Sequence, residues 1–414
     1  MMTSEKIKEV IALEKVDKDI SSEKGYSLWT AAVFMISFNA GLGLLALPHA
    51  LAGTGWFGIV LIALASLNSC YSSIILGETW LIMERQWEEY RGKFRYPYPA
   101  IGMRAAGAWM RYVVTGTLHT TAVGVSVVYL LVSAQVGQSM CEEYFSLGYK
   151  TWIIILGTIL CPLTWFGSIE KFKFAGLGAM LSILAACLAM IVGIVLDLLK
   201  TETVNWEPPT ISSISMSFGT MLFAFGGIFF YVTVQNDMRC KQQFNKASIV
   251  SFITLLILYI PVTVTGYMVY GSDVAPNLIF SLSKGSLRTF IEVCLAIHTF
   301  LAILLGINPV VQEIEEALNV PSVFNYKRCL IRTFIIFLVV TIGYTIPHFD
   351  KMMNLVGGST TTLLTFIFPS LFYYLIKKNV SFIEKIFLLQ IVLVGMAGGI
   401  SCTFFAVLDI IQTF

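Results

Sequence analysis

Apolar stretches long enough to cross a membrane recur along the whole chain, separated by short polar segments. A helix that crosses ~30 Å of hydrocarbon needs roughly 20 mainly apolar residues. By this measure the pattern predicts eleven membrane-spanning helices, the fourth of them short and the last longer than needed. The predicted spans are 27–52, 56–83, 111–139, 151–167, 173–199, 212–234, 247–270, 287–311, 328–346, 352–376 and 382–412.

Two of these spans contain helix-breaking residues at their centres. The first includes FNAGLGLLALPHALAGTGW, with Gly41 and Gly43 in its middle, and the sixth includes FAFGGIFF, with Gly226 and Gly227. Glycine and proline are the poorest helix formers. Spans five apart cross in opposite directions, and broken helices at corresponding positions of two antiparallel halves are typical of inverted-repeat transporters.

This pattern predicts an all-α membrane protein in three parts. A polar tail occupies residues 1–26, a transporter core occupies 27–376, and a loop with one additional span occupies 377–414. Within the core, the two inverted repeats are expected at roughly 27–200 and 212–376.

The composition agrees with a protein embedded in lipid. Hydrophobic residues make up 57% of the 414 residues and charged residues 13%, about half the share typical of soluble domains. The net charge of +2 is too small to suggest a nucleic-acid partner. Of the eight cysteines, only Cys141 is expected near the outer face, so no external disulfide framework is indicated. The first 26 residues contain no apolar signal-peptide core.

The loops differ in positive charge in an alternating manner. Five lysines precede the first span and six Lys or Arg residues follow the second, whereas the intervening loops carry about one each. Cytosolic loops are enriched in Lys and Arg. We therefore expect a cytosolic N-terminus and an extracellular or lumenal C-terminus, in either the plasma membrane or a lysosomal or vesicular membrane.

The two breaks together predict a substrate site. Unpaired backbone groups in hydrocarbon cost several kcal/mol each, so a break persists only where something satisfies them. A half-helix start is partly positive and a half-helix end partly negative, which suits the carboxylate and ammonium of an amino acid. The alternative is that these glycines only let helices pack closely. The predicted substrate-binding residues at the breaks are Asn39, Ala40, Gly41, Leu42, Gly43, Phe225, Gly226, Gly227 and Ile228.

A series of short motifs runs in order from about residue 40 to residue 320. They are GLGLLALPHALAGTGW (41–56), YPYPAIGMRAAG (96–107), FGTMLFAFGG (218–227) with QNDM (235–238), GYMVYG (266–271) and GINPVVQEIEEAL (306–318). Together they resemble the amino acid/auxin permease family. The resemblance implies a LeuT-like 5+5 fold and secondary active transport, usually driven by H⁺ or Na⁺. Ile228, Val232 and Lys241 depart from the family's His, Pro and Pro, so substrate preference and coupling do not carry over from its His-bearing branch.

The residues at the breaks are uncharged, which favours a neutral amino acid or a small relative such as a γ-amino acid as substrate. In the third span, Thr117 and Thr121, with Thr115 and Ser126, are further candidates for the lining. Threonine and serine in membrane helices often hydrogen-bond their own backbone instead.

The coupling ion is predicted to be H⁺. Buried titratable residues in membranes are functional candidates by default, and the candidates here are His49, His119 and Glu78. His298 in the eighth span is a similar case, beside Thr299. A sodium site needs several oxygen ligands, and Thr299 has no adjacent Ser or Thr. Na⁺ coupling through Thr299 and exchange without an ion stay open as alternatives.

Other function classes are less well supported. The first alternative hypothesis is a sensor that binds an amino acid with little flux. The second is a passive channel, which needs a continuous polar line through the bundle. An enzyme is not expected, because no metal-spaced His/Cys set, phosphate loop or nucleophile–base pair is apparent; no cofactor or metal is predicted. The small-residue pair Gly395 and Gly399 in the last span favours packing within one chain, and hence a monomer.

Overall fold

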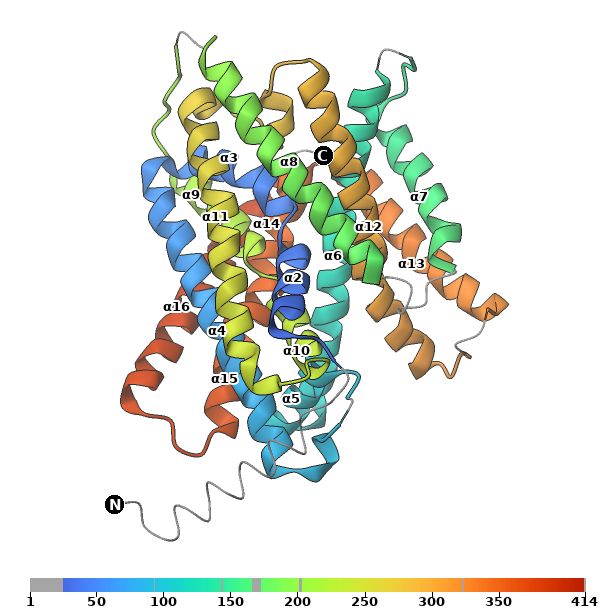
Figure 1. Cartoon of the computed structure of the whole chain (residues 1–414), viewed down its shortest axis with the longest axis vertical. Coiled ribbons are helices and arrows are strands. Elements are labelled where there is room, and N and C mark those ends of the chain that lie inside the picture. The colour runs from blue at the N-terminus through green and yellow to red at the C-terminus, as the bar shows by residue number, and fades with distance from the viewer. Residues whose placement is uncertain are drawn as a thin grey trace.

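The chain folds into a bundle of long helices that run between two ends of the molecule (Figure 1). The computed structural model describes residues 25–92, 94–142, 144–165, 173–200, 203–321 and 324–412. Within these residues no β-strand is present beyond an isolated bridge between Tyr26 and Met238. The α-helices are α2 (Leu28–Asn39), α3 (Leu42–Thr54), α4 (Gly58–Gln86), α5 (Pro97–Ala106), α6 (Ala108–Cys141), α7 (Tyr149–Trp165), α8 (Lys173–Leu198), α9 (Ile211–Ala224), α10 (Ile228–Asn236), α11 (Phe244–Tyr270), α12 (Ser286–Ala317), α13 (Tyr326–Thr345), α14 (Phe349–Val356), α15 (Phe368–Ile376) and α16 (Phe382–Ile411).

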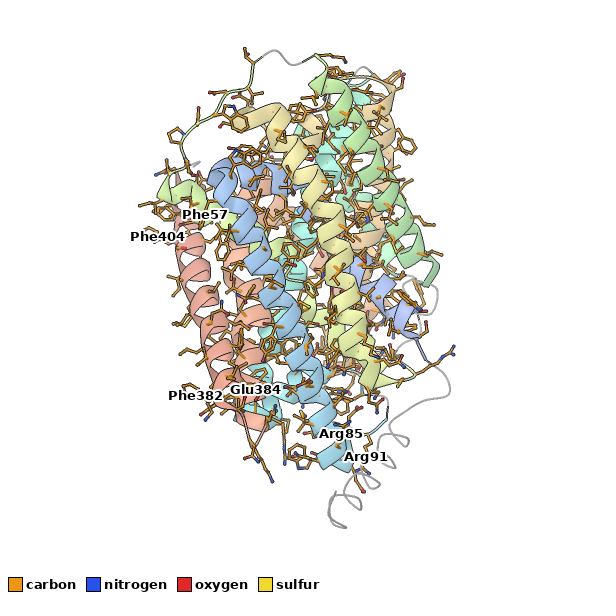
Figure 2. All side chains as sticks on the ribbon, turned by 60° about the vertical axis from the view of Figure 1, so that its left-hand side comes forward. Phe57, Arg85, Arg91, Phe382, Glu384 and Phe404 are labelled. Carbon is orange, nitrogen blue, oxygen red and sulfur yellow. The ribbon has the colours of Figure 1, made fainter. Side chains whose placement is uncertain are left out.

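Nine helical segments of the described residues are long and apolar enough to cross a membrane, one of them joining α3 to α4. Two further apolar helices, α2 and α7, are shorter. Large apolar side chains such as Phe57, Phe382 and Phe404 are more than half exposed on the outside of the bundle, as lipid contact requires (Figure 2). The predicted all-α membrane fold is therefore confirmed, while the count of eleven spans stays a prediction.

Both predicted helix breaks are present. The first span divides into α2 and α3, which are separated by Ala40 and Gly41, and the sixth divides into α9 and α10, which are separated by residues 225–227. α3 packs against α9 and α11, and α2 packs against α8, α10 and α11. The two breaks thus lie together at the centre of the bundle.

Several boundaries differ from those expected. The eighth span, predicted to end at residue 311, continues as α12 to Ala317 because carboxylates in its last two turns find partners on neighbouring helices. The loop after the second span contains the short helix α5, which starts at Pro97 and ends at Ala106, just before Gly107 with a φ of 91°. The tenth span contains two π-helical segments, Gly357–Thr361 and Leu363–Ile367, between α14 and α15.

One end of the bundle is closed by the segment that precedes α2. We call it the basic end, since Arg85 and Arg91 lie there (Figure 2), and it is the end expected to face the cytosol. The backbone N–H of Tyr26 donates to Asp237 O at 2.8 Å, and the N–H of Arg239 donates back to Tyr26 O at 2.9 Å. Arg239 Nε also donates to Gly25 O at 2.8 Å. The start of α2 and the end of α10, which are the basic-end halves of the first and sixth spans, are therefore tied together by backbone hydrogen bonds.

A buried ion pair lies beside this closure. Lys241 Nζ, 3% exposed, is paired with Glu84 Oε1, which is fully buried at the end of α4. The same ammonium donates to Asn236 Oδ1 at 3.1 Å and to Gly92 O at 3.4 Å. Breaking a buried pair by removing one partner is strongly destabilising, because the remaining charge stays buried without compensation.

We expect Lys241→Met to destabilise the protein by about 3–5 kcal/mol, visible as a lower midpoint for thermal loss of monodisperse protein in detergent. Lys200→Met is the control, because Lys200 is 69% exposed and lies 3.8 Å from Asp197; a loss below about 1 kcal/mol is expected there. The double variant Glu84→Gln/Lys241→Met should recover part of the loss. A single Lys241→Met variant as stable as wild type would contradict this account of the pair.

Candidate substrate-binding site

Asn39, the last residue of α2, connects the two breaks. Its Oδ1 accepts a hydrogen bond from the backbone N–H of Gly227, the residue that precedes α10, at 2.9 Å. Its Nδ2 donates to the hydroxyl of Tyr231, and its backbone oxygen accepts from the hydroxyl of Tyr259 at 2.7 Å. One side chain therefore satisfies a free donor of the sixth span, while a tyrosine from α11 satisfies a free carbonyl of the first.

The π-helical part of the tenth span contacts the second break at Gly226. Thr365 Oγ1 donates to the backbone oxygen of Gly226 at 2.9 Å, and Thr365 itself is fully buried. Thr361 lies against Gly226 so closely that a Cβ on this glycine would overlap with its methyl group. π-helical turns concentrate at functional sites, and here they bring the Thr365 hydroxyl to the Gly226 carbonyl and the Thr361 methyl group against the same glycine.

A small cavity of about 30 Å³ lies between the breaks. Among the predicted residues, Asn39, Leu42, Gly43, Gly226 and Gly227 line it. It has room for water but not for an amino acid. None of the residues that line it is charged, and four aromatic side chains contribute to its wall: Phe38, Tyr129, Phe223 and Phe229.

The other predicted break residues lie outside this lining. Ala40 and Gly41 form the break itself. Phe225 is fully buried against Phe252 and Tyr259, with ring centroids 6.5 and 5.5 Å away. Ile228, the first residue of α10, is also fully buried.

Two glycines at the breaks leave no room for a side chain. A Cβ on Gly41 would overlap with Nε2 of His298. A Cβ on Gly227 would overlap with Asn39 Oδ1 and would lie 2.9 Å from the Phe38 ring.

The predicted threonines of the third span do not reach the cavity. Thr117 and Thr121 each donate to the backbone oxygen four residues earlier in α6, at 2.8 Å. Ser126 does the same, whereas Thr115 lies 3.4 Å from Glu313. The α6 residues that line the cavity are Val125 and Tyr129, which lie one and two turns beyond Thr121.

The predicted coupling residues are scattered. His49 Nδ1 lies 2.8 Å from Val274 O, and His119 Nε2 lies 3.0 Å from Glu313 Oε2. Glu78 accepts from Tyr373 at 3.1 Å in a network that includes Lys377 and Glu384 near the basic end. Thr299 is buried next to the site, but its hydroxyl donates to Leu295 O and accepts from Ser133, both at 2.8 Å. The structure does not bring these four residues together.

A larger cavity of about 290 Å³ opens at the end of the bundle opposite the basic end. Its wall includes His49, Glu207, Asp350 and residues of α9. At its inner side, Thr220 Oγ1 donates to Asn354 Oδ1 at 2.5 Å. Thr220 lies one turn of α9 from Ala224, which lines the small cavity. The two cavities therefore lie about one turn apart along α9.

Sequence reasoning missed Thr361, Thr365, Tyr231 and Tyr259. The run Gly-Gly-Ser-Thr-Thr-Thr at 357–362 is a signal that was available, since glycines and hydroxyl residues at the middle of an apolar span are unusual there. The two tyrosines carry no such signal, because aromatic residues are common in membrane helices and only the fold shows which of them reach a break.

Comparisons with known proteins identify relatives among amino acid transporters. The sequence profile of a family described as transmembrane amino acid transporter protein matches residues 24–410. The amino acid transporter AVT1I of Arabidopsis thaliana is 26% identical, over 92% of this chain and 96% of its own. Vacuolar amino acid transporter 4 of Saccharomyces cerevisiae is 24% identical, over 86% of this chain and 54% of its own.

Solved structures share the fold. MhsT in complex with L-phenylalanine aligns with a TM-score of 0.56 at 11% identity, over 93% of this chain and 100% of that chain. Mhp1, a nucleobase-cation-symport-1 family transporter with bromovinylhydantoin bound, aligns with a TM-score of 0.54 at 13% identity, over 95% and 94%. The predicted LeuT-like fold is thus confirmed. Because the family profile covers nearly the whole chain, the chain belongs to the transmembrane amino acid transporter family, a family of transporters and not of enzymes.

Proposed function

We propose that this protein carries neutral amino acids, or small relatives such as γ-amino acids, across a membrane by alternating access and with H⁺ as the coupling ion. The observation that carries the proposal is the uncharged cavity between the two helix breaks, at which Asn39 of one break meets Gly227 of the other. Family membership supports amino acid transport.

The start of α3 is the better of the two positions for the substrate carboxylate. The N–H of Gly227 is already taken by Asn39, whereas Gly41, the residue that precedes α3, supplies no side-chain cap to the start of that helix. The free N–H groups there, together with the partial positive charge of a helix start, favour an anion. The ammonium group would then face carbonyls freed at the ends of α2 and α9.

The walls of the cavity favour an apolar substrate side chain. Phe38, Phe223 and Phe229 surround the breaks with aromatic surface, and Phe38 stacks on Phe230 with ring centroids 4.6 Å apart. A substrate with a charged side chain would lose its hydration here without gaining a counter-ion, which is costly.

Alternating access accounts for the sizes of the two cavities. The cavity at the breaks is too small for a substrate, whereas the cavity beyond Thr220 and Asn354 is about 290 Å³. The basic end is closed by backbone hydrogen bonds of Tyr26 with Asp237 and Arg239. Substrate would enter from the larger cavity once α3 and α9 separate from α14, and leave at the basic end once that pairing opens.

We further propose a vacuolar or vesicular membrane, a cytosolic N-terminus and a monomer. The yeast relative named as vacuolar supports this membrane, and the concentration of Lys and Arg at the basic end supports the orientation. H⁺ is favoured over Na⁺ because the Thr299 hydroxyl is committed to Leu295 and Ser133.

The direct test is uptake by purified protein in liposomes, with alanine, leucine, phenylalanine, glutamine and γ-aminobutyrate as neutral probes and lysine and glutamate as charged ones. Each probe is offered under an imposed H⁺ gradient, an imposed Na⁺ gradient, and neither. We expect at least one neutral probe to accumulate under the H⁺ gradient and the charged probes to stay near background. If no neutral probe moves under any condition, the transport proposal fails.

Asn39→Leu should abolish most of the uptake of the neutral probe. The variant leaves the Gly227 N–H without its acceptor, and an unsatisfied buried donor costs about 1–3 kcal/mol. Asn68→Leu is the matched control, because Asn68 is also buried but its Nδ2 has no hydrogen-bond partner among the described residues. Initial uptake rates, normalised to reconstituted protein, give the comparison. Equal rates in the two variants would show that Asn39 does not organise the site.

Gly227→Leu should also stop uptake, since even the first side-chain atom overlaps with Asn39. Gly116→Leu is the control: Gly116 also lies in a membrane helix, α6, but has open space where a Cβ would stand. We expect Gly116→Leu to transport at nearly the wild-type rate. Normal transport by Gly227→Leu would mean that the site is elsewhere.

A further inference from the structure

His298 has an unusual environment for a buried histidine. It lies in α12 with no exposed surface, beside the break of the first span. Its Nδ1 is 2.9 Å from the backbone oxygen of Ala179 in α8. A carbonyl oxygen can only accept, so Nδ1 carries the proton of the neutral ring and Nε2 presents a lone pair.

That lone pair faces the helix break. Nε2 of His298 has no hydrogen-bond partner among the described residues, and a Cβ on Gly41 would overlap with it. Tyr129 approaches the same glycine from α6, with its hydroxyl 3.2 Å from that Cβ position. Buried polar atoms are nearly always paired, so an orphaned one calls for an explanation.

Among the described residues, the groups that hydrogen-bond or stack with His298 are uncharged. Its ring contact is with a phenol, that of Tyr129 from α6, with ring centroids 6.0 Å apart. Tyr259 from α11 donates to Asn39 O at the same break. From α8 the ring meets a backbone carbonyl. Among the described residues, the hydrogen bonds and ring contacts of His298 include no Asp, Glu, Lys or Arg. Glu292 lies six residues away, about 9 Å along α12, and is paired with Arg288 at 3.1 Å.

We propose that His298 is the residue that takes up and releases the coupling proton. The proposal rests on the proposed function and names the ion-binding group of the same site. One proton from the aqueous phase binds the Nε2 lone pair and gives an imidazolium, while the Nδ1–H continues to donate its hydrogen bond to Ala179 O. The new Nε2–H donates toward carbonyls that the break leaves free at the end of α2. Loss of the same proton on the other side of the membrane restores the neutral ring.

The position of His298 links proton and substrate. A buried cation is costly without a nearby anion, and the start of α3 next to Gly41 is where the substrate carboxylate is proposed to bind. Each ligand therefore lowers the cost of binding the other. Such a linkage is reciprocal and amounts to roughly 5- to 150-fold in affinity in known systems. The substrate's apparent Kd should then rise with pH in the wild-type protein.

The four histidines of the chain make a complete set for the test. Each is changed singly to Gln in full-length protein, because a Gln amide can still donate to Ala179 O or to Glu313 but cannot take up a proton near neutral pH. The readout is the rate of uptake driven by an H⁺ gradient divided by the rate of counterflow without a gradient. The probe is the panel amino acid with the highest wild-type counterflow.

We expect His298→Gln to lower this ratio at least about fivefold and to remove the pH dependence of the substrate's apparent Kd. His348→Gln is the matched control, since His348 precedes α14 and its side chain makes no capping hydrogen bond. A ratio unchanged in His298→Gln, or lost in His49→Gln or His119→Gln instead, overturns the assignment.

A second variant covers the case in which His298→Gln does not fold. The triple variant His49→Gln/His119→Gln/His348→Gln keeps His298 as the sole histidine. It should retain H⁺-driven uptake and substrate-induced proton influx, recorded with a pH-sensitive dye; loss of both with counterflow intact overturns the proposal. Counterflow in wild type without any H⁺ dependence also overturns it but leaves transport standing, whereas no counterflow in wild type refutes the proposed function itself.

Discussion

Backbone groups that lose their partners where two helices stop inside the bundle are the constraint on which the site depends. In a setting without water, each such group must be satisfied by the protein or by a ligand. Asn39 satisfies some of these groups at both breaks. Its side chain accepts from the Gly227 N–H, and its backbone carbonyl accepts from the Tyr259 hydroxyl. The Thr365 hydroxyl satisfies another, the backbone carbonyl of Gly226. Gly41 supplies no side-chain cap to the start of α3. This difference between the two breaks is why the substrate carboxylate is proposed to bind at the start of α3.

The two ends of the molecule are built from different kinds of contact. At the basic end, backbone pairing of Tyr26 with residues 237–239 and the buried Lys241–Glu84 pair hold several elements together. Toward the opposite end, the hydrogen bond between Thr220 and Asn354 lies in the wall of the larger cavity. The basic end is therefore held by backbone hydrogen bonds and a buried ion pair, whereas this wall includes a hydrogen bond between uncharged side chains.

The breaks were predictable from the sequence because glycines in the middle of an apolar run are a local signal. Span ends were less so: α12 continues to Ala317 because Glu313 meets His119, 194 residues away, and Glu315 meets Arg332 on the next helix. The same reason explains the candidate site. Asn39 was predicted from its place at a break, but Thr365 contributes through a π-helical turn whose effect only the assembled bundle shows.

The connection through Asn39 also has a consequence for how the chain is made. The partner of its side chain, Gly227, follows 188 residues later, and at a synthesis rate of 5–20 residues per second that is a delay of about 10–40 s. Throughout this interval the first span lacks the Gly227 N–H from which its Asn39 side chain accepts in the folded protein. The site between the two breaks is therefore completed only after the sixth span has been made.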